Sequence, residues 1–203
     1  DAYLHETTDP AIFPEMGQAG LLGVTVADEH GGAGASYVAY GLVAREIERI
    51  DSGYRSMASV QSSLVMFPIE AYGSAEQKRT YLPRLASGEW IGGFALTEPQ
   101  AGSDASNLRT RARRDGDHYV IDGTKQFITS GKNGKVVIVF AVTDPDAGKK
   151  GISAFLVPTD TPGYQVVTVE QKLGLHASDT CALAFTDMRV PVENRLGAEG
   201  EGY

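Results

Sequence analysis

Cysteine, histidine and tryptophan are scarce in this sequence: its 203 residues include one, four and one of them. The lone Cys181 excludes an internal disulfide and is typical of proteins from a reducing compartment. The histidines are scattered and no HExxH or CxxC spacing occurs, so the sequence predicts no metal site. No apolar run reaches about 18 residues, the length of a membrane-spanning helix, so no membrane insertion is predicted either.

Positive charge is also in the minority. The chain has 18 Lys and Arg against 26 Asp and Glu, a net charge of −8, so no nucleic-acid partner is predicted. Its 42% of apolar residues are enough for a sizeable core. Glycine is abundant instead, with 24 residues in 203 against a usual share of about 7%, which indicates many turns and room for a loop that lies close to a ligand.

The spacing of apolar residues is helical up to about residue 90. Helices are expected over residues 37–50, 56–72 and 75–88, the second kinked at Pro68 and the third opened by a capping box from Ser74 to Gln77. In the first of these, one apolar face is formed by Leu42, Val43, Ile47 and Ile50.

After residue 90 apolar and polar residues alternate, as in half-buried strands. Asp122-Gly123 is expected to be the turn of a hairpin with strands over 118–122 and 124–128. Further short strands are expected over residues 90–96, 136–142, 151–157, 164–169 and 180–185. Helices first and strands afterwards predict an α+β fold, with an N-terminal helical domain followed by an antiparallel β-sandwich or barrel.

Arg109, Arg111 and Arg113 alternate along one expected strand. Their spacing predicts a solvated strand face, and a phosphate-binding patch is the alternative.

The segment from Phe94 to Asp104 is a strand that runs into a turn crowded with hydroxyls and carboxylates. Pro99 fixes its own φ, Gly102 lets backbone approach a ligand, and the hydroxyls of Thr97 and Ser103 can donate hydrogen bonds. These residues suit either an ordinary strand-to-loop junction or a loop that holds a flat ring with carbonyls and a phosphate tail.

This segment resembles the flavin-binding signature of the acyl-CoA dehydrogenase family. Other stretches that resemble the family follow in the same order, namely Ala71 to Arg79, Tyr81-Leu82-Pro83, Gly123 to Thr129, Lys172 to Ser178 and Val190-Pro191. The resemblance spans nearly the whole chain. It implies an N-terminal helical domain over residues 1–92, a middle β-domain that binds FAD and acyl-CoA over 93–196, and a linker over 197–203 into a C-terminal helical domain that this chain lacks.

The resemblance also implies site residues. The residues expected to bind FAD are Phe94, Leu96, Thr97, Gly102, Ser103, Phe127, Ile128 and Thr129. Leu96 and Thr97 are expected to hydrogen-bond the flavin ring, and Ser103 to lie near the pyrophosphate and the thioester arm of the substrate. Phe127 stands where the family usually has Trp, so it keeps an apolar face and lacks the indole N–H.

The two halves of the chain resemble different branches of the family. Arg55 and Ser56 lie in a stretch similar to glutaryl-CoA dehydrogenases, in which the Arg-Ser pair meets the far carboxylate of the substrate. The alternative is that Arg55 makes a helix cap or a salt bridge. From about Phe94 onward the chain is more similar to short- and medium-chain acyl-CoA dehydrogenases, so the acyl group is left open between these classes.

The activity implied is FAD-dependent oxidation of an acyl-CoA thioester between its α and β carbons, including the oxidation and decarboxylation of glutaryl-CoA to crotonyl-CoA. The family's catalytic glutamate lies in the C-terminal domain, so no catalytic base is expected in this chain. The resemblance further implies an electron-transferring flavoprotein as acceptor, a homotetramer, and a location in the cytoplasm of a bacterium or the mitochondrial matrix of a eukaryote. The rivals are a flavin oxidase of the same fold and, for this chain alone, a non-catalytic domain pair that binds flavin and CoA.

Overall fold

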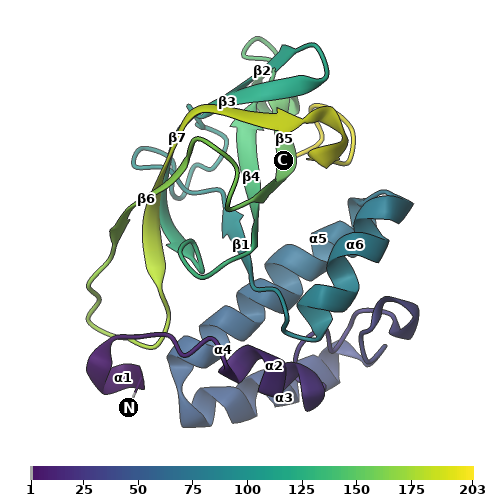
Figure 1. Ribbon diagram of the computed structural model, residues 1–203, viewed down its shortest axis with the longest axis vertical. Coiled ribbons are helices and arrows are strands. Elements are labelled where there is room, and N and C mark those ends of the chain that lie inside the picture. The colour runs from purple at the N-terminus through teal and green to yellow at the C-terminus, as the bar shows by residue number, and fades with distance from the viewer. Residues whose placement is uncertain (1) are drawn as a thin grey trace.

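A helical half and a sheet half lie side by side in the computed structural model, which describes residues 2–203 (Figure 1). The α-helices are α1 (Ala2–His5), α2 (Ile12–Gln18), α3 (Tyr37–Ile50), α4 (Ser52–Ser59), α5 (Phe67–Tyr72) and α6 (Ala75–Ala86). A π-helical segment, η2 (Val60–Met66), joins α4 to α5, and short 3₁₀ turns are η1 (Asp28–His30), η3 (Gly148–Gly151) and η4 (Val192–Asn194).

Helix α3 has the predicted bounds, and the Ser36 side chain caps it by accepting the N–H of Ala39. Its apolar face, however, is largely uncovered: Leu42 is 50% exposed and Ile50 86%. Helical spacing gathers apolar residues on one face, but it does not supply a partner for that face. Ile47 packs against the helical core, but Leu42 and Ile50 stay largely exposed, and this face forms a shallow apolar groove with Leu21.

The second predicted helix begins earlier and is wound differently. The carboxylate of Asp51 caps α4 by accepting the N–H groups of Gly53 and Tyr54, so the helix starts at Ser52 instead of 56. The disturbance expected at Pro68 takes the form of η2, in which the N–H of Phe67 donates to Ser62 O, five residues back. The wider π turn relieves the clash that a proline ring makes with a preceding carbonyl in an α-helix. The capping box predicted for α6 is present.

The sheet half is a single eight-stranded sheet, in which most neighbouring strands are antiparallel. The strands are β1 (Gly92–Ala95), β2 (Arg111–Asp115), β3 (His118–Thr129), β4 (Val136–Val142), β5 (Ile152–Pro158), β6 (Tyr164–Val169), β7 (Thr180–Pro191) and β8 (Arg195–Leu196). Their order is β6-β7-β3-β2-β4-β5-β8, and β1 pairs with β4 in parallel. The α+β prediction, helices followed by a mostly antiparallel sheet, is confirmed.

The hairpin predicted at Asp122-Gly123 is wrong. β3 runs straight through both residues, and Gly123 sits at an irregularity in its pairing with β7. The turn lies instead at Gly116-Asp117, because Asp115 of β2 pairs directly with His118 of β3. Both sites contain an Asp-Gly pair. Gly116 adopts a left-handed φ of 64°, whereas Gly123 is needed because a Cβ there would lie 2.4 Å from the Thr110 hydroxyl.

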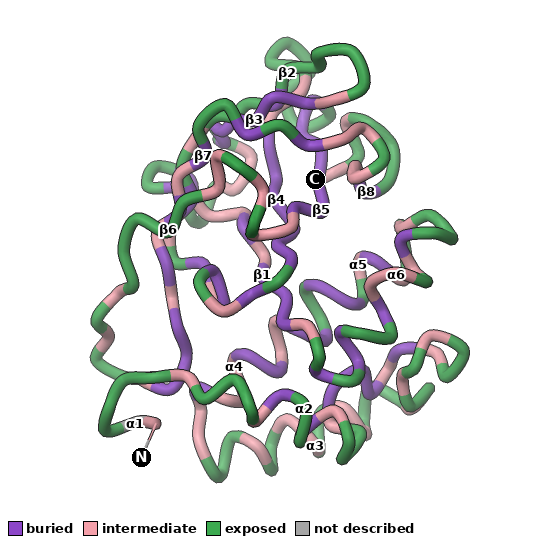
Figure 2. The backbone as a smooth tube through the Cα atoms, viewed as in Figure 1, coloured by how far each residue is buried: buried purple, intermediate pink, exposed green. Residues whose placement is uncertain are grey.

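The molecule has two apolar cores, visible as the buried stretches of the tube in Figure 2. One lies between the helices and the near face of β1, β4 and β5, and the other lies within the sheet half. Residues 197–203, predicted as a linker, lie against β5, where Gly200 N–H donates to the Ser153 hydroxyl and Gly202 N–H to Ile152 O.

Candidate functional site

The loop that follows β1 is held in one conformation by its own backbone. Glu98 and Ala101 exchange both N–H···O=C bonds, at 3.1 and 3.0 Å, across a turn made by Pro99 and Gln100. Phe94 and Leu96 share one face of the strand and Thr97 the other, as alternation requires. The Phe94 ring packs against Phe140, with ring centroids 4.8 Å apart, so its side chain faces the helical half rather than the loop.

A buried ion pair fixes this loop to β3. Lys125 Nζ lies 2.8 Å from Glu98 Oε1 and also donates to Leu96 O at 3.0 Å. The other oxygen of Glu98 accepts the Arg109 N–H at 2.7 Å and the Gln100 amide at 2.7 Å. Both side chains of the pair are almost entirely excluded from solvent. A half-satisfied buried charge is costly, so these bonds hold the loop in position.

The ionisation of this pair follows from its partners. Burial raises the pKa of the Glu98 carboxyl, but Lys125 and the donors of Thr110 and Arg109 outweigh it and hold that pKa at about 2. Burial lowers the pKa of Lys125 to about 8 against the attraction of Glu98. Glu98 is therefore a permanently ionised anchor and not a proton acceptor at neutral pH.

A bulge in β3 brings a second segment to the same place. The pairing of β3 with β7 is interrupted between Lys125 and Ile128, and the Gln126 N–H leaves the ladder to donate to Thr97 O at 2.9 Å. Phe127 within this bulge has a φ of 61°, which is uncommon for a bulky residue, and its side chain is 59% exposed. Strained backbone of this kind clusters at ligand sites.

Two hydroxyl groups lie beside this bulge. Among the residues that the structure describes, the hydroxyls of Thr97 and Thr129 make no hydrogen bond, although both residues are partly buried. Gly102 and Ser103 lie in the exposed part of the loop, and a Cβ at Gly102 would meet nothing within 4 Å. The site thus offers partly buried donors, an exposed ring and open space, which fit a flat polar ligand such as the flavin ring.

The predicted flavin-binding residues fall into four groups in the structure, one of which is Gly102 and Ser103 in the exposed part of the loop. The Leu96-Thr97 end of β1 and the bulge around Phe127 are joined through Gln126, and Thr129 O lies 3.1 Å from where a Gly93 Cβ would be. Ile128 is buried and points into the sheet core. Phe94 faces away, as described above.

Arg55 and Ser56 lie apart from these residues, on α4 in the helical half. Arg55 Nε donates to Glu48 Oε2 at 2.5 Å, which is the salt bridge considered as the alternative. That bond uses one of the five N–H donors of the guanidinium, and its terminal nitrogens bond to nothing in residues 2–203. The Arg55 side chain is one-third exposed, so these nitrogens remain able to pair with a second carboxylate.

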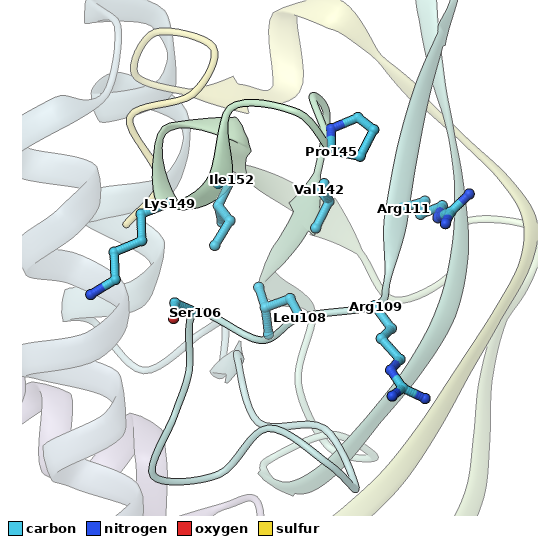
Figure 3. Close-up of a pocket in the computed structure, with 9 residues that line it drawn as sticks. Ser106, Leu108, Arg109, Arg111, Val142, Pro145, Lys149 and Ile152 are labelled. Atoms are coloured by element: carbon cyan, nitrogen blue, oxygen red, sulfur yellow. The ribbon is translucent and has the colours of Figure 1, made fainter.

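A cavity of about 470 Å³ opens behind the same loop (Figure 3). Leu108 lines it opposite Val142 and Ile152, with Arg109 and Arg111 on one side and Lys149 on the other. Two alternatives were predicted for the arginines, a solvated strand face and a phosphate-binding patch. Arg111 fits both, because it is exposed on β2 and also lines a cavity flanked by cations.

Sequence reasoning assigned no role to Lys125 or Gln61. Lys125 lies in the stretch from Gly123 to Thr129 that resembles the family. The one feature that could have indicated its role is a positive charge inside an expected strand, for which Glu98 offers a partner of opposite charge. Nothing in the sequence indicated a role for Gln61, because a polar residue in a helix usually faces solvent.

No helix in the described part of the chain is long and apolar enough to cross a membrane.

Comparison with known proteins identifies the family of this chain. Family models for the acyl-CoA dehydrogenase N-terminal domain and middle domain match residues 1–89 and 93–188. An acyl-CoA dehydrogenase of Bacillus subtilis is 46% identical over all of this chain and 54% of its own length. A short-chain specific acyl-CoA dehydrogenase of Clostridium acetobutylicum is 44% identical, over 93% of this chain and 50% of its own.

Among solved structures, the glutaryl-CoA dehydrogenase of Mycobacterium smegmatis in complex with FADH2 is 46% identical, with a TM-score of 0.92 over 98% of this chain and 50% of that one. The chain spans about half the length of the curated relatives it matches. The two family models, taken together, match most of its residues, in the order of the helical and sheet halves. The chain belongs to the acyl-CoA dehydrogenase family.

Proposed function

We propose that this chain provides the flavin- and CoA-binding half of an FAD-dependent enzyme that oxidises an acyl-CoA between its α and β carbons. The observation that carries the proposal is the set of unpartnered hydroxyls of Thr97 and Thr129 beside the strained, exposed Phe127. Residues 1–92 would be the helical domain, 93–196 the middle domain and 197–203 the linker to a C-terminal domain.

The bound FAD would supply acceptance of a hydride. The chain's own residues bind and orient it. The hydroxyls of Thr97 and Thr129 donate to acceptors on the ring, the Leu96 backbone lies beside them, and the Phe127 ring covers an apolar face. Gly102 and Ser103 leave room for the phosphate-bearing tail and the thioester arm. The ion pair of Glu98 and Lys125 holds these donors in place before any ligand arrives, which is what preorganised binding requires.

The cavity of Figure 3 would receive the nucleotide part of CoA. Arg109, Arg111 and Lys149 offer cations to phosphate groups, and a guanidinium binds phosphate with two parallel N–H donors. The apolar side chains that line the cavity suit the adenine ring or the pantetheine chain.

For the acyl group we propose glutaryl, because Arg55 in the first turn of α4 keeps guanidinium donors that no group among residues 2–203 uses. Glu48 would hold the guanidinium through Nε while its terminal nitrogens, with Ser56, meet the far carboxylate of the substrate. Butyryl-CoA or a longer straight chain is the competing substrate, and it has no charge to pair. The base that removes the α-proton would lie in the C-terminal half found in relatives, and the electrons would pass to an electron-transferring flavoprotein.

The test uses an enzyme that carries this chain together with that C-terminal half. Glutaryl-CoA or butyryl-CoA, added without oxygen, should bleach the visible absorption of the bound flavin within seconds. An enzyme that binds no flavin, or whose flavin neither acyl-CoA bleaches, would contradict the proposal. Rapid oxygen consumption without an acceptor protein would identify an oxidase instead.

A further inference from the structure

Gln61 is a fully buried polar side chain at the junction of the two halves. Its Oε1 accepts the Gly92 N–H at 2.7 Å, at the first residue of β1. Its Nε2 donates to Leu85 O at the end of α6 and to Trp90 O, both at 2.8 Å. One amide thus satisfies three backbone groups that come from three segments, and it is the side-chain hydrogen bond that ties η2 to β1 among the described residues.

At this point the backbone of β1 packs directly against a side chain of η2. A Cβ at Gly92 would lie 2.6 Å from Val65 Cγ1, so β1 can pack here only because it begins with glycine. Packing this close leaves little freedom for the helix to slide along the strand.

The π-helical winding keeps Gln61 aimed at β1. The buried side of the helix includes Met57, Gln61, Val65 and Ile69, spaced by four residues. In an α-helix each step of four rotates the row by about 40°. The wider turns of η2 cancel part of that rotation, because a π turn holds more residues than an α turn. The row therefore stays against β1 while Arg55 and Ser56 stand one turn before it.

We propose that Gln61 is a positioning residue, which sets the distance between the helix that carries Arg55 and Ser56 and the strand that leads to Thr97. This inference rests on the proposed function. Through Gly92 the amide fixes where β1 begins, and Thr97 lies five residues farther along the chain. Through the helix it fixes where Arg55 stands, six residues before it. A shift of about 1 Å between reacting or binding groups can cost about 100-fold in rate, so this register matters for selectivity.

The test is Gln61→Met in the enzyme with both halves, with Gln77→Met as the matched control. Gln77 is also buried, donates its amide to Glu193 O and Arg195 O, and accepts the Ser74 N–H, but it joins α6 to η4 and β8. Both changes remove the same kinds of bond and should lower Tm. We expect only Gln61→Met to change the ratio of kcat/KM for glutaryl-CoA to that for butyryl-CoA, by about ten-fold or more.

A ratio that Gln61→Met leaves unchanged, or that Gln77→Met changes equally, overturns the inference. If Gln61→Met does not fold, Val65→Ala, which trims the contact with Gly92, takes its place with the same expectations. An unmodified enzyme that oxidises neither acyl-CoA contradicts the proposed function and not this inference.

Discussion

The hydroxyl of Thr97 makes no hydrogen bond within the described residues 2–203. If that hydroxyl donates to the flavin ring, Thr97→Val leaves a buried acceptor unpaired, at a cost of about 1–3 kcal/mol. We expect FAD affinity to fall by that amount and the visible flavin spectrum to shift. Titration of the apoenzyme with FAD measures both. Thr124→Val, at an exposed position of β3, is the control, and equal affinities for the two variants would contradict the role of Thr97.

Arg55 decides between the two substrate classes. Truncating one member of a buried pair of charges typically costs about 2–5 kcal/mol, or about 30-fold to a few thousand-fold in binding. Arg55→Ala should lower kcat/KM for glutaryl-CoA within that range and leave butyryl-CoA almost unchanged. Steady-state kinetics on both substrates provide the measurement. Arg49→Ala, which removes a neighbouring exposed guanidinium paired with Glu46, should affect neither; equal losses on both substrates for Arg55→Ala would end its carboxylate-binding role.

Glu98 makes stability depend on acid pH. The pKa of Glu98 falls from 4.5 to about 2 on folding, so the folded state binds fewer protons than the unfolded chain between these values. Its contribution to stability is complete above about pH 4.5 and is lost as the pH falls towards 2. Glu98→Gln should have a lower Tm at pH 7, and the difference from the unmodified protein should shrink between pH 4.5 and 2. Glu15→Gln, which removes an exposed carboxylate, is the control variant.

At the scale of single residues, sequence reasoning placed some groups and not others. Thr97 and Phe127 were named from motifs, and the structure joins their segments through Gln126. That link needs a bulge at residues 126–127, and period-two alternation contains no information about where a strand leaves its ladder. The role of Lys125 as an anchor was missed for a different reason: its partner Glu98 lies 27 residues away in the chain, and local patterns do not show such a pairing.

Among the elements, the hairpin between β2 and β3 shows how local signals compete. Asp115-Gly116 and Asp122-Gly123 are equally good turn dipeptides. The second lies inside a strand because the residues on both sides of it pair with β7, a partner about 60 residues away that local propensity does not detect. Helices α3 and α6 were placed well, because their caps and spacing are local. The π-helical winding before Pro68 was not, since it depends on packing against β1.

Two glycines test the corrected position of that turn. Gly116→Ala places a side chain at positive φ in open space, which costs about 1–2 kcal/mol. Gly123→Ala forces a Cβ against the backbone and side chain of Thr110 as well, and overpacking adds about 1–3 kcal/mol. We expect Gly123→Ala to lower the free energy of unfolding more, as urea denaturation would show. A larger loss for Gly116→Ala than for Gly123→Ala would instead support a turn at Asp122-Gly123.

On the scale of the whole molecule, the 203 residues contain the proposed flavin- and CoA-binding residues but not the proposed catalytic base. The proposed base lies outside them, and Glu98 is committed to Lys125. Purified residues 1–203 should therefore show no acyl-CoA oxidation with a dye as electron acceptor. The enzyme with both halves, assayed in parallel, is the positive control. Measurable turnover by residues 1–203 would require a base among their own carboxylates.

The parallel pairing of β1 with β4 has a consequence for the order of folding. Gly92 pairs with Val136, so 44 residues of chain must close into a loop before β1 docks. The β2–β3 and β4–β5 hairpins need much shorter closures and form more readily. Thr97 follows β1 directly, so the proposed flavin-binding donors come together late. A chain that has formed only its hairpins would present no pocket to the cofactor, and cofactor capture would report that folding is complete.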